Sequence, residues 1–264
     1  MTQAGPVAVF DSGVGGLTVA REIRAALPAE DLLYLADSAW CPYGGRPPEQ
    51  VRDRTVTIGE FLQARGAKVL VVACNTASGA ALEALRERLR IPVVGMEPAI
   101  KPAVKSSPSG RVGVMATEGT VASERFRRLL REYGAGVQVV AQACPGLADL
   151  VEEGEFDGER VRAALEPYVR PLRDAGVDTV VLGCTHYPYL AAAISESLGP
   201  HVRLVDPAPA IARQTRRVLE ERGILAADDR EGRVRIVTTG DPLEEGRVVA
   251  RLWPEPVQVE GVVV

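Results

Sequence analysis

Short apolar runs rich in β-branched residues alternate with helical patterns along the chain, and this alternation constrains the fold most. Strands are expected at 7–10, 32–35, 68–73, 92–95, 111–115, 137–141, 177–182, 202–205 and 233–237. Helices are expected at 17–27, 49–65, 77–89, 119–133, 188–198 and 208–222, with another within 158–174 that Pro167 and Pro171 interrupt or bound. Apolar strands alternating with helices are typical of parallel sheets covered by helices. The sequence therefore predicts an α/β fold.

Composition narrows the class of protein. The 264 residues are 46% hydrophobic and 25% charged, which is typical of a soluble globular protein of one large or two small domains. The net charge of −4 argues against a basic surface for nucleic acid. The chain has no apolar run of transmembrane length, and Asp11 follows the first short apolar stretch too soon for a signal peptide. We therefore expect a cytoplasmic protein, without membrane or nucleic-acid partners, whose thiols are reduced.

One segment of the chain is echoed later. Residues 69–76 and 179–186 each comprise an apolar strand, a small residue, a cysteine and a polar pair before a helix. Chance can produce so short a match, but duplication is the favoured explanation. Cys74 and Cys184 then occupy matching places in two similar halves. The Pro- and Ser-rich residues 105–110 are expected to form a surface loop near a domain junction.

Polar turns follow three of the predicted strands, at the edge where parallel α/β sheets bind ligands. They comprise residues 11–16, 74–76 and 184–186. The first does not match the GxGxxG dinucleotide-binding motif, because Thr18 stands where the third Gly or Ala should be. It does not match a Walker A phosphate-binding loop either, because no Gly-Lys-Ser/Thr follows. Its glycines let backbone N–H groups approach a small anion such as a carboxylate. The alternative, which this stretch alone favours, is a tight turn with Asp11 as a helix cap.

The two matching cysteines suggest a reaction class. A buried cysteine is by default a small hydrophobe, but a helix start lowers the pKa of a thiol. Two such thiols facing each other across a cleft suit the inversion of a carbon, which needs a base on one face and an acid on the other. Asp11 beside Cys74 and His186 beside Cys184 are candidates to tune them, although a lone histidine is also compatible with a structural role.

The remaining rare residues divide in two groups. The single asparagine, Asn75, directly follows Cys74. Cys41 and Cys144 each precede a proline and are interpreted as loop residues without a catalytic role, and His201 as a surface residue. No metal is expected, because two cysteines and one nearby histidine lack zinc-ligand spacing.

Several motifs together resemble the glutamate racemase family. They are residues 10–19, 36–38 with 42–44, 73–78 and 183–188, with weaker matches at 113–117, 143–145 through 151–152, and 239–241. The motifs follow the family order over nearly the whole chain. The sequence departs from the usual family pattern at Trp40-Cys41 and Met115-Ala116. These residues are expected at the rim of the pocket, away from the groups that transfer protons.

The resemblance implies an enzyme that interconverts L- and D-glutamate without a cofactor, for peptidoglycan precursors. It also implies two similar α/β domains related by pseudo-two-fold symmetry, with the active site in the cleft between them. One domain comprises residues 1–96 and 207–264, and the other residues 97–206. A homodimer is expected as well.

The resemblance also assigns roles to residues. Cys74 is the base acting on D-glutamate, Cys184 is the base acting on L-glutamate, and Asp11, Glu152 and His186 assist proton transfer, with Glu153 as the alternative to Glu152. The residues implied to bind substrate are Asp11, Ser12, Tyr43, Gly44, Asn75, Thr76, Thr185 and His186.

Other functions stay open. A sister racemase acting on aspartate or a hydantoin would use the same paired thiols. A redox protein with a Cys74–Cys184 disulfide would normally carry a Cys-x-x-Cys motif, which is absent. A two-lobed amino-acid-binding protein would not need two equivalent thiols. Pyridoxal phosphate is not expected, because none of the three lysines follows a strand end.

Overall fold

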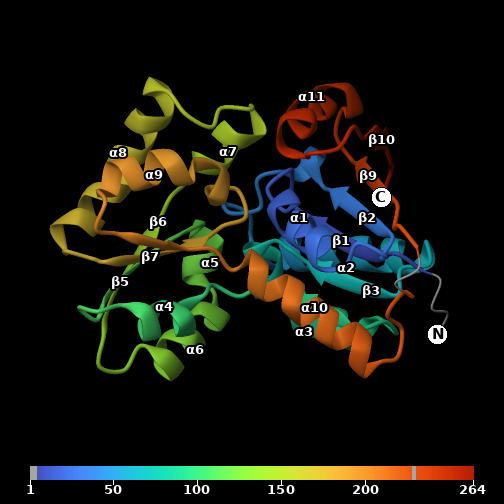
Figure 1. The fold of residues 1–264 in the computed structure, drawn as a ribbon, viewed down its shortest axis with the longest axis horizontal. Helices are drawn as coiled ribbons and strands as arrows, with labels where there is room; N and C mark the ends of the chain where they lie inside the picture. The colour runs from blue at the N-terminus through green and yellow to red at the C-terminus, as the bar shows by residue number, and fades with distance from the viewer. Residues whose placement is uncertain (1–4, 228–229) are drawn as a thin grey trace.

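The protein folds into two lobes, each built around one parallel sheet (Figure 1). The computed structural model describes residues 5–227 and 230–264. The first lobe contains a six-stranded sheet of order β10-β9-β2-β1-β3-β4 and the second a four-stranded sheet of order β6-β5-β7-β8. The first sheet comprises β1 (Val7–Asp11), β2 (Leu32–Ala36), β3 (Val69–Val72), β4 (Val93–Gly95), β9 (Val234–Thr238) and β10 (Val259–Gly261). The second comprises β5 (Arg111–Ala116), β6 (Gln138–Ala143), β7 (Thr179–Gly183) and β8 (Arg203–Val205).

Helices flank both sheets, because the central strands are apolar on both faces and must be covered on both. All residues of β1, β3 and β7 are buried. The first lobe carries α1 (Leu17–Ala26), α2 (Pro48–Ala64), α3 (Asn75–Arg88), α10 (Ala208–Glu221) and α11 (Pro242–Leu252). The second carries α4 (Ile100–Ser106), α5 (Glu118–Ala122), α6 (Glu124–Tyr133), α7 (Leu147–Glu152), α8 (Glu159–Asp174) and α9 (Ala191–Leu198). The predicted α/β class is confirmed.

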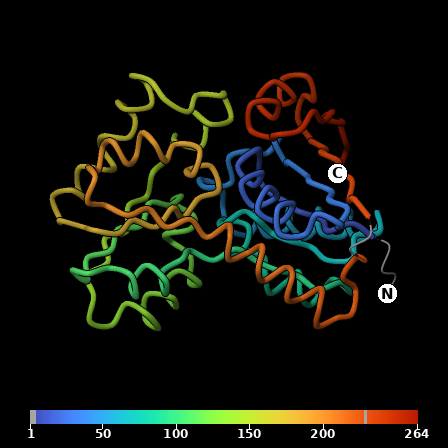
Figure 2. The backbone as a smooth tube through the Cα atoms, viewed as in Figure 1, coloured from blue at the N-terminus to red at the C-terminus, as the bar shows by residue number. Residues whose placement is uncertain are grey.

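The two lobes repeat one topology. The order β2-β1-β3-β4 in the first sheet corresponds to β6-β5-β7-β8 in the second. The helix after the fourth strand crosses over in each case: α4 packs against β5 and α6 of the second lobe, and α10 against α1 of the first. Figure 2 shows the two crossings of the chain between the lobes. Because β3 and β7 are equivalent strands, Cys74 and Cys184 follow equivalent strand ends.

The C-terminal segment returns to the first lobe, where β9 pairs with β2 and β10 with β9. The C-terminus lies on this lobe in Figure 2. This topology supports the proposed division into residues 1–96 with 207–264 and residues 97–206. Residues 1–4 and 228–229 of that division lie outside the described part of the chain.

Some elements differ from the sequence expectation. The helix expected at 119–133 is two helices, because Ser123 caps α6 by accepting a hydrogen bond from the Phe126 N–H. In contrast, α8 continues through Pro167 and Pro171, held by a buried apolar stripe. The helix expected at 188–198 begins as a 3₁₀ turn, Tyr187–Leu190. The loop expected at 105–110 starts later, because α4 extends to Ser106. The 3₁₀ turn Ser38–Trp40 and the elements α4, α7, α11 and β10 were not expected.

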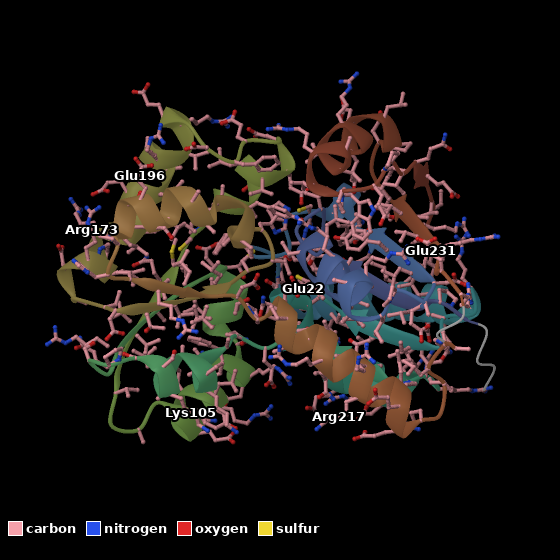
Figure 3. The ribbon with its side chains drawn as sticks, viewed as in Figure 1. Glu22, Lys105, Arg173, Glu196, Arg217 and Glu231 are labelled. Carbon is pink, nitrogen blue, oxygen red and sulfur yellow. The ribbon has the colours of Figure 1, made fainter. Side chains whose placement is uncertain are left out.

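The surface mixes charges of both signs. Figure 3 shows Lys105, Arg173 and Glu196 on the outside of the second lobe and Arg217 and Glu231 on that of the first. Every helix among the described residues is too short or too polar to cross a bilayer.

A buried ion pair ties the C-terminal segment to the first lobe. Glu30 and Lys68 are 1% and 2% exposed at their side chains, and their charged atoms lie 2.6 Å apart. The Lys68 ammonium also donates to the Ile224 carbonyl, and the Ala226 N–H donates to Glu30. Glu30 thus balances a buried cation and fixes the segment before β9.

We therefore expect Glu30→Gln to lower the free energy of unfolding by about 1.5–3 kcal/mol, because it removes a hydrogen-bonded carboxylate from the buried Lys68 ammonium. Urea denaturation measures this change. The control Glu60→Gln removes a largely exposed partner of Arg88 and should leave stability nearly unchanged. Equal stability of the two variants would contradict the role given to the buried pair.

Candidate active site between the lobes

Asp11 links the first turn to the second lobe. It ends β1 and is fully buried. Its Oδ2 atom accepts hydrogen bonds from the Gly16 N–H at 2.6 Å and from the Thr185 hydroxyl at 3.1 Å. Its Oδ1 atom has no hydrogen-bond partner among the described residues. Burial raises the pKa of Asp11, and although nearby His186 opposes this rise, Glu152 adds to it.

The glycines of this turn make room for side chains of the other lobe. A Cβ atom on Gly13 would lie 2.0 Å from Oε1 of Glu152, and one on Gly15 would lie 2.4 Å from Nδ1 of His186. The Val14 N–H donates to the same Glu152 oxygen at 2.8 Å. The anion bound by the Val14 N–H is therefore the Glu152 carboxylate. The sequence predicted a small anion at this turn but did not identify it.

Cys74 lies at the N-cap of α3, where the sequence places it. Its Sγ accepts a hydrogen bond from the Ala77 N–H at 3.4 Å and lies 3.8 Å from the Ser12 hydroxyl. However, burial raises the pKa of the Cys74 thiol, and the negative charge of Asp11 adds to the rise. These two effects outweigh the Ala77 N–H, so the expectation of a lowered pKa at Cys74 is wrong here. The surroundings of Cys74 therefore favour the thiol over the thiolate.

Cys184 follows β7, but no α-helix begins beside it. The Tyr187 N–H bonds to its carbonyl in the 3₁₀ turn, and α9 starts only at Ala191. The helix dipole expected at Cys184 is therefore displaced by several residues. In its place, Nδ1 of His186 lies 3.5 Å from the Cys184 sulfur.

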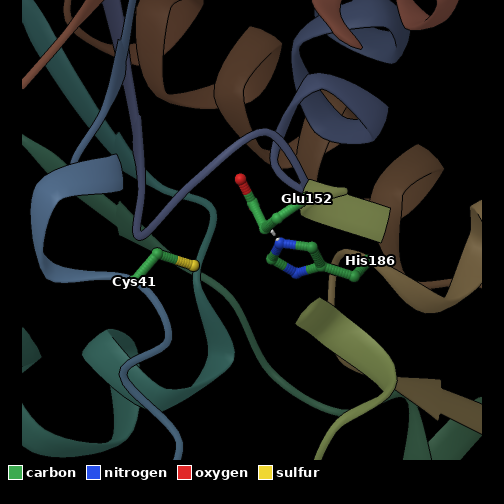
Figure 4. Close-up of side chains that lie close together, drawn as sticks. All are labelled: Cys41, Glu152 and His186. Carbon is green, nitrogen blue, oxygen red and sulfur yellow. Dashed lines mark hydrogen bonds and ion pairs between the residues drawn. The ribbon is translucent and has the colours of Figure 1, made fainter. Parts of the chain in front are cut away.

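His186 connects Cys184 to Glu152. Its Nε2 lies 2.5 Å from Oε1 of Glu152 (Figure 4), while its Nδ1 faces the Cys184 thiol. Burial disfavours the imidazolium, but Cys184, Cys41 and Glu152 outweigh this effect and raise the pKa of His186 well above its usual value. Glu153, the alternative to Glu152, is half exposed and pairs with Arg160 instead. Of the two glutamates, Glu152 is therefore the one that contacts His186.

Both cysteines line one small cavity at the junction of the lobes. Its free volume is about 10 Å³, room for roughly one water molecule. The predicted residues that line it are Ser12, Tyr43, Gly44, Cys74, Asn75, Thr76, Cys184, Thr185 and His186. Asp11 and Glu152 lie behind Thr185 and His186, as their hydrogen bonds show. The site residues expected from the sequence are thus brought together.

Asn75 is the wall residue best prepared for a ligand. It is 5% exposed, and both polar atoms of its side chain are buried without a hydrogen-bond partner among the described residues. Buried amides are normally paired. A polar ligand in this cavity would satisfy the Asn75 amide, which none of the described residues pairs.

A larger cavity of about 460 Å³ adjoins this one and shares Gly44 and Thr76 with it. Hydrogen bonds close the boundary between the lobes there. The Gly119 N–H donates to the Gly44 carbonyl at 2.9 Å, and the hydroxyls of Thr76 and Thr117 lie 2.8 Å apart. Because the cavity between the cysteines holds roughly one water molecule, it must widen to admit an amino acid, and separation of these contacts would widen it.

Tyr43 contributes less polarity to the cavity than expected. Its hydroxyl donates to Oδ2 of Asp37 at 2.5 Å, and Arg54 and Thr239 bind the same carboxylate. The hydroxyl is therefore engaged away from a ligand, which leaves the ring and backbone of Tyr43 to shape the wall.

Sequence reasoning missed Asp37, Thr117 and Cys41. The repeat offered a signal for Thr117, which follows β5 as Ser12 follows β1. Cys41 lies beside Glu152 and His186, with the three ligand atoms within 4.8 Å of one another (Figure 4). Cys41 lies in a loop, as predicted, but its approach to Glu152 and His186 was not predicted. Cys144 is buried in the core, where its carbonyl accepts a hydrogen bond from the Tyr187 hydroxyl.

The His186–Glu152 pair makes a direct prediction. Replacing Glu152 by Gln removes an adjacent negative charge, so the pKa of His186 should fall. NMR titration of the imidazole protons measures it, and a His201→Gln variant assigns the two histidine signals. The matched control Glu153→Gln should leave the titration of His186 unchanged. A pKa of His186 that is insensitive to Glu152→Gln would contradict the pairing.

Comparison with known proteins now identifies the family. Residues 15–215 match the Asp/Glu/Hydantoin racemase family model. A glutamate racemase of Herpetosiphon aurantiacus is 50% identical over 92% of this chain and 96% of its own length. One from Methylococcus capsulatus is 50% identical over 94% of this chain and 92% of its own. The structure of a Bacillus anthracis glutamate racemase isoform is 38% identical, with a TM-score of 0.91 over 100% of this chain and 99% of that one. The chain therefore belongs to the Asp/Glu/Hydantoin racemase family.

Proposed function

We propose that this protein interconverts L- and D-glutamate without a cofactor, using Cys74 and Cys184 as two bases on opposite faces of the substrate. The observation that carries the proposal is that both thiols line one cavity, each from the equivalent strand end of its lobe. Two glutamate racemases share 50% identity with this protein over more than nine tenths of the chain. This similarity supports glutamate as the substrate.

The chemistry explains why two thiols are needed. One thiolate removes the α-hydrogen, and the opposite thiol protonates the resulting carbanion from the other face, which inverts the carbon. An α-hydrogen is far less acidic than a thiol, whose ordinary pKa is about 8.5. The site must therefore stabilise the carbanion electrostatically, and closure of the lobes would strengthen this by excluding water.

The two thiols have different electrostatic surroundings. Burial and Asp11 keep Cys74 protonated, which suits it to deliver a proton. Beside Cys184, the His186 imidazolium would stabilise a thiolate, and Glu152 holds that imidazolium in place. We propose that Asp11, Glu152 and His186 assist proton transfer in this way.

The substrate's charged groups have matching partners in the cavity. We propose that Asn75, Thr76 and Thr185 hold the α-carboxylate, with the unpaired Asn75 amide as the main donor. Ser12, Tyr43 and Gly44 complete the wall. The free Oδ1 atom of Asp11 is available to the ammonium group.

Replacing either Cys74 or Cys184 by Ser should lower kcat by about 10²–10⁴-fold in both directions, because a general acid–base step loses one partner. Circular dichroism of glutamate, with purified protein and no added cofactor, measures the rate. The matched control Cys144→Ser changes a buried cysteine outside the cavity and should retain activity.

Full activity of Cys184→Ser in both directions would contradict the two-base scheme. The same assay with aspartate and a hydantoin tests the sister activities. Turnover of either in preference to glutamate would overturn the proposed substrate and leave the paired-thiol chemistry standing.

Three further expectations stay predictions: a homodimer, a cytoplasmic location, and the supply of D-glutamate for peptidoglycan. Light scattering of the purified protein tests the first. Rescue by D-glutamate of cells depleted of the protein tests the last.

A further inference from the structure

Three side chains that could ligate a metal meet at the edge of the active site. The Cys41 thiol, the Glu152 carboxylate and the His186 imidazole each present one ligand atom, all within 4.8 Å of one another (Figure 4). They come from distant parts of the chain: the turn after β2, the end of α7 and the turn after β7. The racemisation proposed above uses Glu152 and His186 but gives Cys41 no task.

We propose that Cys41, Glu152 and His186 form an inhibitory zinc site. Thiolate, imidazole and carboxylate are the ligands that zinc takes in proteins, and three of them with a water molecule complete a tetrahedron. Metal–ligand bonds of about 2.0–2.3 Å place neighbouring ligand atoms about 3.4 Å apart. The His186–Glu152 contact of 2.5 Å would widen and the Cys41 sulfur would move inward, both by side-chain rotation.

The cluster has a route to solvent. Glu152 is 20% exposed at its side chain and lines a cavity of about 210 Å³. Asp241, Glu244 and Glu245 line the same cavity. Carboxyl groups along this route favour entry of a cation over that of an anion.

Zinc binding would block His186, and this consequence rests on the proposed function. Zn–S and Zn–N bonds form as the Cys41 thiol proton and the Nε2 proton of His186 leave to solvent, and Glu152 exchanges its bond to Nε2 for a bond to zinc. The remaining imidazole proton stays on Nδ1, which faces Cys184. His186 is then unable to pass a proton between Cys184 and Glu152.

The binding test compares the whole protein with Cys41→Ser and with the matched control Cys144→Ser. Equilibrium dialysis measures Zn²⁺ affinity, and Co²⁺ reports a thiolate ligand by charge-transfer absorption. Loss of a residue that only hydrogen-bonds to a metal ligand weakens metal binding by about 10–100-fold. Loss of the Cys41 ligand itself should therefore weaken zinc binding at least tenfold. Cys144→Ser should bind like the unchanged protein. Glu152→Gln, assayed only for Co²⁺ binding, should also weaken the affinity.

The activity test uses the same three proteins. Zinc should inhibit the unchanged protein and Cys144→Ser, with recovery on adding a chelator, and the midpoint of inhibition should rise at least about tenfold in Cys41→Ser. Cys41→Ala provides a second variant if the serine variant does not fold. Equal zinc affinity and inhibition with and without Cys41, or Co²⁺ binding that lacks its thiolate band, would overturn the proposal. Absence of racemase activity from the metal-free protein would instead overturn the proposed function. The dialysis and the Co²⁺ spectra would still show whether Cys41, Glu152 and His186 bind a metal ion.

Discussion

The candidate site depends on one contact between the lobes, in which the glycine turn after β1 receives Glu152 and His186 from the second lobe. The absence of side chains at Gly13 and Gly15 lets the carboxylate and the imidazole approach the turn. The Val14 N–H donates a hydrogen bond to Glu152, and Asp11 accepts one from the hydroxyl of Thr185, the neighbour of His186. Because this contact orients His186, it also sets the surroundings of Cys184. Neither lobe alone contains a complete site.

The near-symmetry of the lobes places the two thiols, while their differences tune them. Cys74 caps an α-helix but sits in a buried, negatively charged environment that raises its pKa. Cys184 lacks a helix start, and His186 fills that role with a charged ring. The repeated fold thus supplies two equivalent positions, and local differences bury one thiol beside Asp11 and place the other beside His186.

Much of this arrangement could be predicted from the sequence, because it is encoded locally. Strands such as 69–72 are apolar on both faces, and the repeat around Cys74 and Cys184 marks equivalent strand ends. The short edge strand β10 was missed because its residues are largely exposed. The choice of Glu152 over Glu153, and the approach of Cys41 to His186, depend on how distant segments pack. The pKa of Cys74 was misjudged because local helix position is outweighed by burial, which only the tertiary structure reveals.

The central claim is that two monoprotic thiols act on opposite faces of one carbon, and the fate of solvent deuterium tests it most directly. L-Glutamate is incubated with the purified protein in deuterium oxide, the reaction is stopped early, and the separated enantiomers are analysed by mass spectrometry. The account predicts deuterium at Cα of newly formed D-glutamate, while recovered L-glutamate keeps its original hydrogen. Product that retains the original hydrogen, or recovered substrate labelled as fully as product, would contradict it.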